Sequence, residues 1–118
     1  MRLNAPAFLA MCALLLAACA QPLPQDKLEY AGEWRGEGTR LVISPSGLCD
    51  YERKRGGSSV SINAPIKQFE GDNFVVGVGP MTTTFVVSKP PHLANGRWRM
   101  VVDGVELTRT GTFGEVST

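Results

Sequence analysis

The chain has one histidine, His92, among its 118 residues, and no cysteine or second histidine stands at metal-ligand spacing from it. Its serines form no Gly-x-Ser-x-Gly motif, and its glycines lack the spacing of a phosphate-binding loop. Asp50 and Glu52 would share one strand face with Lys54, which is typical of a solvated surface. We therefore expect no enzyme activity, no metal site and no bound cofactor.

No charge of one sign dominates. Twelve Lys and Arg accompany eleven Asp and Glu, and the numbers become equal without Arg2, which lies in a segment that we expect to be removed. A nucleic-acid-binding protein needs a clustered positive surface to neutralise phosphates. The balance argues against a nucleic-acid partner.

The apolar run near the N-terminus, AFLAMCALLLAA, is too short to cross a bilayer. One positive residue, Arg2, precedes it, and no stop-transfer charges follow. This pattern is typical of a secretory signal peptide, which we assign to residues 1–18.

The end of that segment, Leu16, Ala17, Ala18 and Cys19, resembles the lipobox of bacterial lipoproteins. The resemblance implies that the Cys19 thiol carries a diacylglyceryl group, that the signal is cut just before it, and that the new amino group is acylated, commonly with palmitate. Two acyl chains are what stable membrane anchoring requires. Ala20 in place of Asp implies, by the same resemblance, the outer membrane, with the domain on its periplasmic face. The alternative is an ordinary signal peptide whose mature protein begins with Cys.

Lipidation would leave Cys49 as the lone thiol, because Cys12 departs with the signal. An intramolecular disulfide is then impossible. A lone thiol in an oxidising compartment is buried or paired with another chain, and we expect burial.

Residues 19–29 contain two prolines and no periodic apolar pattern. We predict that they form a lipidated, semi-extended tether of about 30 Å, at about 3.1 Å per residue, which would hold the domain clear of the headgroups.

Residues 30–110 alternate apolar and polar side chains, with turn signals about every eight to twelve residues. We predict an all-β domain, a single small antiparallel meander barrel of about eight short strands, because closure removes exposed edges. Asp103-Gly104 is the strongest hairpin signal, since a type I′ turn needs positive φ at both central positions. Pro65 predicts a bulge or strand break, residues 89–96 a longer loop, and residues 111–118 a frayed tail.

The alternation assigns nineteen mostly large side chains to the interior. They are Trp34, Leu41, Ile43, Cys49, Tyr51, Val60, Ile62, Ile66, Phe69, Phe74, Val76, Val78, Phe85, Val87, Trp98, Met100, Val102, Val105 and Leu107. The interior of an eight-stranded barrel is just wide enough for side chains or one small ligand. We expect these side chains to fill it.

The opening Gly32-Glu33-Trp34, followed by an alternating strand and a Ser46-Gly47 turn, resembles the start of lipocalin-like and avidin-like barrels. In those families a Gly-x-Trp on the first strand plugs one end of the barrel. Residues 30–109 are also similar to small periplasmic lipoproteins of unassigned function. The resemblance implies a fold and no particular ligand.

Two groups of outward residues are candidate partner surfaces. Arg53, Lys54 and Arg55 would form a basic hairpin tip, with Arg97 and Arg99 outward beside Trp98, suited to an anionic polysaccharide, a lipid A phosphate or an acidic partner; a solubilising turn is the alternative. The outward apolar residues are Val42, Val75, Val86 and Val101. We expect the last three to lie on consecutive strands and to line up as an apolar docking stripe, unless valine simply suits a pleated surface.

We therefore expect a non-enzymatic binding or accessory lipoprotein that engages an envelope protein or polysaccharide through its exterior. One alternative is a lipocalin-like carrier of a small apolar ligand, which needs an internal cavity. Another is a periplasmic lysozyme or protease inhibitor, because residues 46–51, SGLCDY, are similar to part of the lysozyme inhibitors. The paired cysteines of that family are absent, and the basic hairpin tip would repel a basic lysozyme.

Overall fold

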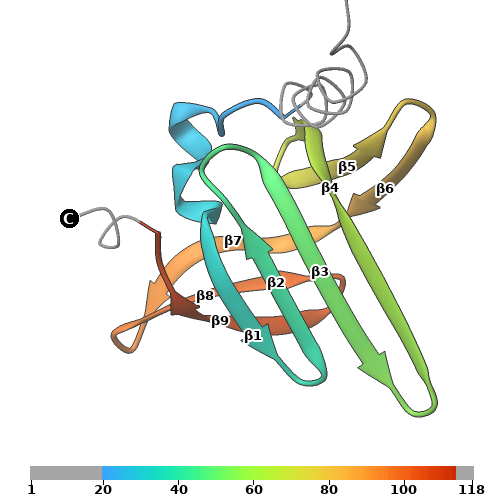
Figure 1. Ribbon diagram of the computed structural model, residues 1–118. Coiled ribbons are helices and arrows are strands. Elements are labelled where there is room, and N and C mark those ends of the chain that lie inside the picture. The colour runs from blue at the N-terminus through green and yellow to red at the C-terminus, as the bar shows by residue number, and fades with distance from the viewer. Residues whose placement is uncertain (1–19, 114–118) are drawn as a thin grey trace, which may run out of the picture.

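The computed structural model of the protein describes residues 20–113, so the predictions made for residues 1–18, for Cys19 and for residues 114–118 lie outside it. A short 3-10 helix, η1 (Gln25–Tyr30), precedes nine antiparallel strands (Figure 1). The strands are β1 (Gly32–Gly36), β2 (Thr39–Ile43), β3 (Leu48–Arg55), β4 (Ser58–Glu70), β5 (Asn73–Val78), β6 (Met81–Phe85), β7 (Val87–Ala94), β8 (Arg97–Val102) and β9 (Val105–Gly111).

The strands form one sheet in the order β6-β5-β4-β3-β2-β1-β9-β8-β7. Every neighbouring pair is consecutive in the chain except β1 and β9, and the sheet curls through 227° into a half-barrel. This confirms the predicted all-β antiparallel meander. Strand β4 pairs with β3 through residues 58–65 and with β5 beyond them, with a register shift between Ile66 and Gln68, so the predicted irregularity lies just after Pro65.

A one-residue corner joins the two ends of this sheet. Strands β6 and β7 stand at opposite ends of the order, yet only Val86 separates them in the chain. Val86 N donates to Asp103 Oδ1 at 2.9 Å, Asp103 N donates to Val86 O at 2.7 Å, and Val87 N donates to Asn73 Oδ1 at 2.8 Å. Asp103 and Gly104 have φ of 48° and 80°, which confirms the predicted tight turn between β8 and β9.

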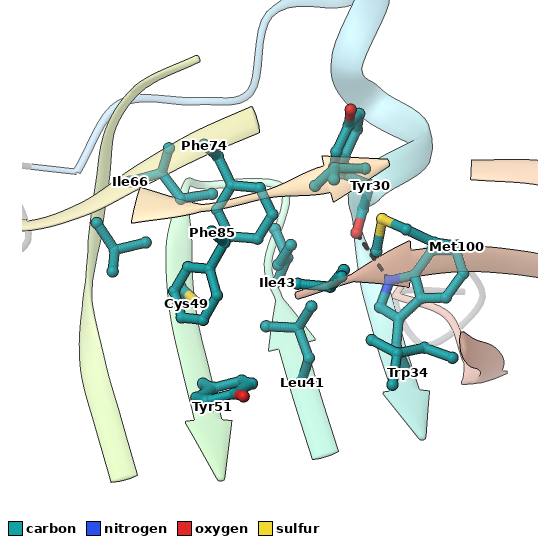
Figure 2. Close-up of a cluster of buried hydrophobic side chains, with 14 of the residues drawn as sticks. Tyr30, Trp34, Leu41, Ile43, Cys49, Tyr51, Ile66, Phe74, Phe85 and Met100 are labelled. Atoms are coloured by element: carbon teal, nitrogen blue, oxygen red, sulfur yellow. Dashed lines mark hydrogen bonds between the residues drawn. The ribbon is translucent and has the colours of Figure 1, made fainter. Parts of the chain in front are cut away.

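The concave face of the sheet is filled by large side chains (Figure 2). The rings of Phe74 and Phe85 stack at 5.0 Å, and Tyr51 meets Phe85 edge-on at 4.7 Å. Most of the predicted interior set is buried or packs against this core, as expected. Val60 and Val78 are the exceptions: both are exposed, because they lie on hairpins that project past the curled part of the sheet.

Two segments differ from the sequence-based predictions. Residues 89–96, expected as a loop, mostly belong to β7, which pairs with β8 although it contains Pro90 and Pro91. Proline is tolerated there because β7 is an edge strand whose outer side makes no ladder bonds. Gly111, placed in the frayed tail, is the last residue of β9 and pairs with Glu33.

The expectation of an extended tether was wrong for the described residues 20–29. Leu23 is only 6% exposed, and its N–H donates to Pro45 O at 3.0 Å. Helix η1 follows at once, and it ends at Tyr30, whose hydroxyl donates to Asp72 O at 2.8 Å. A segment of this length packs through single apolar residues rather than a periodic face, which is why the sequence pattern missed it.

Candidate functional site

The described chain starts against the turn between β2 and β3. A Cβ on Gly47 would overlap the carbonyl oxygen of Gln21, so glycine lets the N-terminal segment lie directly on this turn. Ile66 N donates to Gly47 O at 2.8 Å and ties the same turn to β4. Together, residues 20–24 and this turn form what we call the N-terminal end of the half-barrel.

A basic groove lies at the opposite end of β2 and β3. It has a volume of about 480 Å³, and it is lined by Glu37, Arg53, Lys54, Arg55, Gly56, Gly104, Val105 and Glu106. Lys54 N donates to Gly38 O at 2.8 Å, which holds the β3–β4 hairpin against the β1–β2 turn. Three cations therefore face two carboxylates, and within residues 20–113 none of these three cations forms an ion pair. The groove can attract an acidic group.

The two other predicted arginines are separated by their positions on β8. Arg99 is half-buried, and its Nη1 lies 3.8 Å from Oε2 of Glu106, a residue that also lines the basic groove. Arg97 is exposed at the start of β8, at the end of the strand away from Asp103 and Gly104. The structure therefore brings Arg99 to the border of the groove and leaves Arg97 outside it.

The predicted apolar stripe does not form. Val75 on β5 is buried, Val101 on β8 is half-buried between Lys89 and Glu106, and only Val86, at the corner, is exposed, at 52%. The prediction of three consecutive paired strands was wrong because β6 and β7 do not pair with each other. Val42 on β2 is half-buried and lies between Glu33 and Asp50 on the charged outer face.

Arg109, which is not among the predicted site residues, has its guanidinium close to two tryptophan rings. Its carbon Cζ is 5.0 Å from the ring of Trp34 and 5.0 Å from that of Trp98, and Nη2 donates to Glu29 O at 2.6 Å. Burial lowers the pKa of Arg109, and its Nε finds no partner among the described residues. Continuing the alternation of Val105 and Leu107 by one step reaches Arg109, so the strand period carried this signal.

This stack gives the Gly-x-Trp motif a physical role. A Cβ on Gly32 would lie 2.8 Å from Gly111 O and 3.1 Å from Arg109 Nε, and Gly32 has φ of 141°, which L side chains rarely adopt. Trp34 is fully buried, and its Nε1 donates to Tyr30 O at 2.9 Å. The motif therefore places a tryptophan, and the arginine stacked on it, close to η1.

Other reactive side chains lie in inert surroundings. Cys49 is fully buried, as expected, and burial raises the pKa of its thiol to about 12. His92 is half-buried, with Nδ1 2.9 Å from Pro90 O. Across residues 20–113 no three acidic, histidine or cysteine side chains gather as a metal site, and no helix there is long and apolar enough to span a membrane.

Comparison with known proteins found no relative of this chain. No protein-family model, no curated protein and no solved structure matches the chain.

Proposed function

We propose that this protein is an outer-membrane lipoprotein, anchored through lipid on Cys19 at the periplasmic face, that acts as a non-enzymatic binding or accessory protein. The observation that carries the proposal is the position of Cys19. It stands directly after a short apolar run behind Arg2 and four residues before Leu23, the first buried residue of the described chain. A lipid on Cys19 would therefore sit next to the folded domain.

The exterior is the better candidate for partner binding than the interior. Trp34, Phe74 and Phe85 are at most 1% exposed, and stacked and edge-on rings fill the space that a carrier of a small apolar ligand would need. This packing favours an accessory protein over a lipocalin-like carrier. The basic groove also disfavours an inhibitor of a basic lysozyme, because like charges would meet.

The basic groove suits an acidic envelope component located away from the anchoring membrane. It lies at the opposite end of β2 and β3 from the segment that follows Cys19. A domain attached through Cys19 would therefore present Arg53, Lys54 and Arg55 to the periplasm. An anionic polysaccharide or an acidic protein surface fits this position, whereas a lipid A phosphate of the same membrane does not.

The anchor is tested by metabolic labelling. Cells that express the chain are fed a palmitate analogue, and labelling of the protein is compared with that of Cys19→Ser. We expect label only on the protein that retains Cys19, together with loss of membrane association in the variant. Equal labelling of both would overturn the proposed anchor.

The partner surface is tested by crosslinking in intact cells. Arg53→Glu combined with Arg55→Glu reverses the charge of the basic groove, and Arg97→Glu is the matched control because it changes one exposed arginine outside the groove. We expect the crosslinked product to disappear in the double variant and to persist in the control. If the product persists in both variants, or disappears in both, the groove is not the partner-binding surface.

A further inference from the structure

We propose that the tip of the β5–β6 hairpin, residues 78–81, contacts the phospholipid bilayer and, together with the anchor, holds the half-barrel in one orientation. The inference rests on the proposed attachment at Cys19. It concerns a surface that the basic groove does not include, at the other end of β2 and β3.

The packed N-terminal segment sets how far the domain can stand from the membrane. Only three residues, 20–22, separate Cys19 from Leu23, which is buried and hydrogen-bonded to Pro45 O. A fully extended chain spans about 3.3–3.6 Å per residue, so these four steps reach about 14 Å at most. The N-terminal end of the half-barrel must therefore face the bilayer at close range.

The β5–β6 tip lies beside this short connection. Lys67 lines a cleft of about 230 Å³ together with Gln21 and Leu23, and its Nζ donates to Gly79 O at 2.8 Å. Lys67 therefore borders the same cleft as the N-terminal segment and is hydrogen-bonded to the hairpin tip. Figure 1 shows the hairpin projecting at the same end of the molecule as the start of the described chain.

The chemistry of the tip suits a lipid interface. Met81 is 78% exposed and Val78 is 49% exposed, with Gly79 and Pro80 exposed between them. Residues 73–88 contain no charged side chain, whereas the β3–β4 tip at the far end carries Arg53, Lys54 and Arg55. Apolar side chains enter the interfacial region of a bilayer, and a lysine at their border places its ammonium among the phosphates. Lys67 occupies that position.

The occupant of this surface is the bilayer rather than another protein, because the short connection brings the tip to the membrane whenever the anchor is in place. The test uses the full chain produced in a bacterial host, recovered from membranes and reconstituted into phosphatidylcholine vesicles with brominated acyl chains. Met81→Trp places a fluorophore at the tip. Ser59→Trp, at an exposed site on the far β3–β4 hairpin, is the matched control, since tryptophan itself favours interfaces.

We expect Met81→Trp to emit at shorter wavelength and to lose emission in brominated vesicles relative to unbrominated ones, beyond the background of Trp34 and Trp98. Ser59→Trp should behave like the unmodified chain. Equal emission of Met81→Trp in the two vesicle types would overturn the inference and would leave a protein partner as the occupant of the tip.

The two proposals fail in distinguishable ways. Palmitate labelling at Cys19 without quenching of Met81→Trp would leave the anchor standing and remove the tip contact. Quenching of Met81→Trp in a chain that carries no palmitate would support the tip contact and remove the lipid anchor. Circular dichroism of both tryptophan variants checks that each one is folded.

Discussion

Leu23→Ala tests whether the segment after the proposed anchor is part of the folded domain. Leu23 is 6% exposed, and its backbone bonds to Pro45, so its side chain packs between the β2–β3 turn and β4. Leu28 lies on the same segment, but 45% of it is exposed. The pair Leu23→Ala and Leu28→Ala therefore removes the same atoms from a buried and from an exposed site.

The two variants should differ clearly in free energy of unfolding. Truncating a buried leucine to alanine costs about 2–5 kcal/mol, and we take the low end, about 2 kcal/mol, because Leu23 lies at the rim, where solvent can fill the space. An exposed substitution such as Leu28→Ala changes stability by less than about 0.5 kcal/mol. Stability of a small domain falls by about 1–3 kcal/mol per molar urea, so the midpoint of Leu23→Ala should move down by about 1 M.

The assay is urea unfolding followed by tryptophan fluorescence. Trp34 is a suitable reporter because it is fully buried and bonded to Tyr30 O, at the end of the same segment. The slope with urea should stay unchanged. If Leu23→Ala and Leu28→Ala unfold at the same urea concentration, residues 20–24 do not pack against the domain, and the short connection to the membrane fails with them.

Two further predictions concern pH and the corner. Burial is the main reason that the pKa values of Cys49 and Tyr30 are raised to about 12, from 9.0 and 10.0. The folded state therefore holds these two protons more tightly than the unfolded state. The stability that this difference contributes is complete below pH 9 and is lost as the pH rises toward 12. The urea midpoint should fall over that interval, less steeply in Cys49→Ala; a flat profile between pH 9 and 11 would contradict this. Asp103→Ala should cost about 2 kcal/mol, because it removes the acceptor for Val86 N and leaves alanine at φ 48°. Asp103→Asn keeps an acceptor oxygen and tolerates that φ, so equal loss in both variants would show that the corner bond is unimportant.

Local patterns predicted much of the fold. Strict alternation placed Leu41, Ile43 and Cys49 in the core, and Asp103-Gly104 identified a turn from two residues. Both signals act between near neighbours: a strand turns every second side chain to the same face, and a tight turn selects residues that accept positive φ. Such preferences can be read from sequence because they need no distant partner.

The errors concern contacts between distant segments. The order of strands in the chain predicts one row of Val75, Val86 and Val101, but β6 and β7 lie at opposite ends of the sheet and do not pair. The prediction that Val60 is buried was wrong for a related reason. Alternation indicates which face of the strand a side chain occupies, but it does not indicate how far a hairpin projects beyond the core. Of the candidate surfaces, the three residues of the basic tip do line one groove. Its two carboxylates, Glu37 and Glu106, belong to segments far from the tip in the sequence, so the local pattern did not indicate them.

The pairing of β1 with β9 determines the order in which this molecule can assemble. Seven of the eight strand pairings join strands that are consecutive in the chain, so most of the sheet can grow hairpin by hairpin. The ladder between β1 and β9 joins residues as far apart as Glu33 and Gly111, 78 positions along the chain. Without this pairing β1 is unpaired on one side, and because non-local contacts form slowly, we expect the closure of β1 on β9 to be a late step of folding. Truncation within β9 should therefore leave a chain that still forms hairpins but exposes the unpaired edge of β1, where another chain can pair and aggregate.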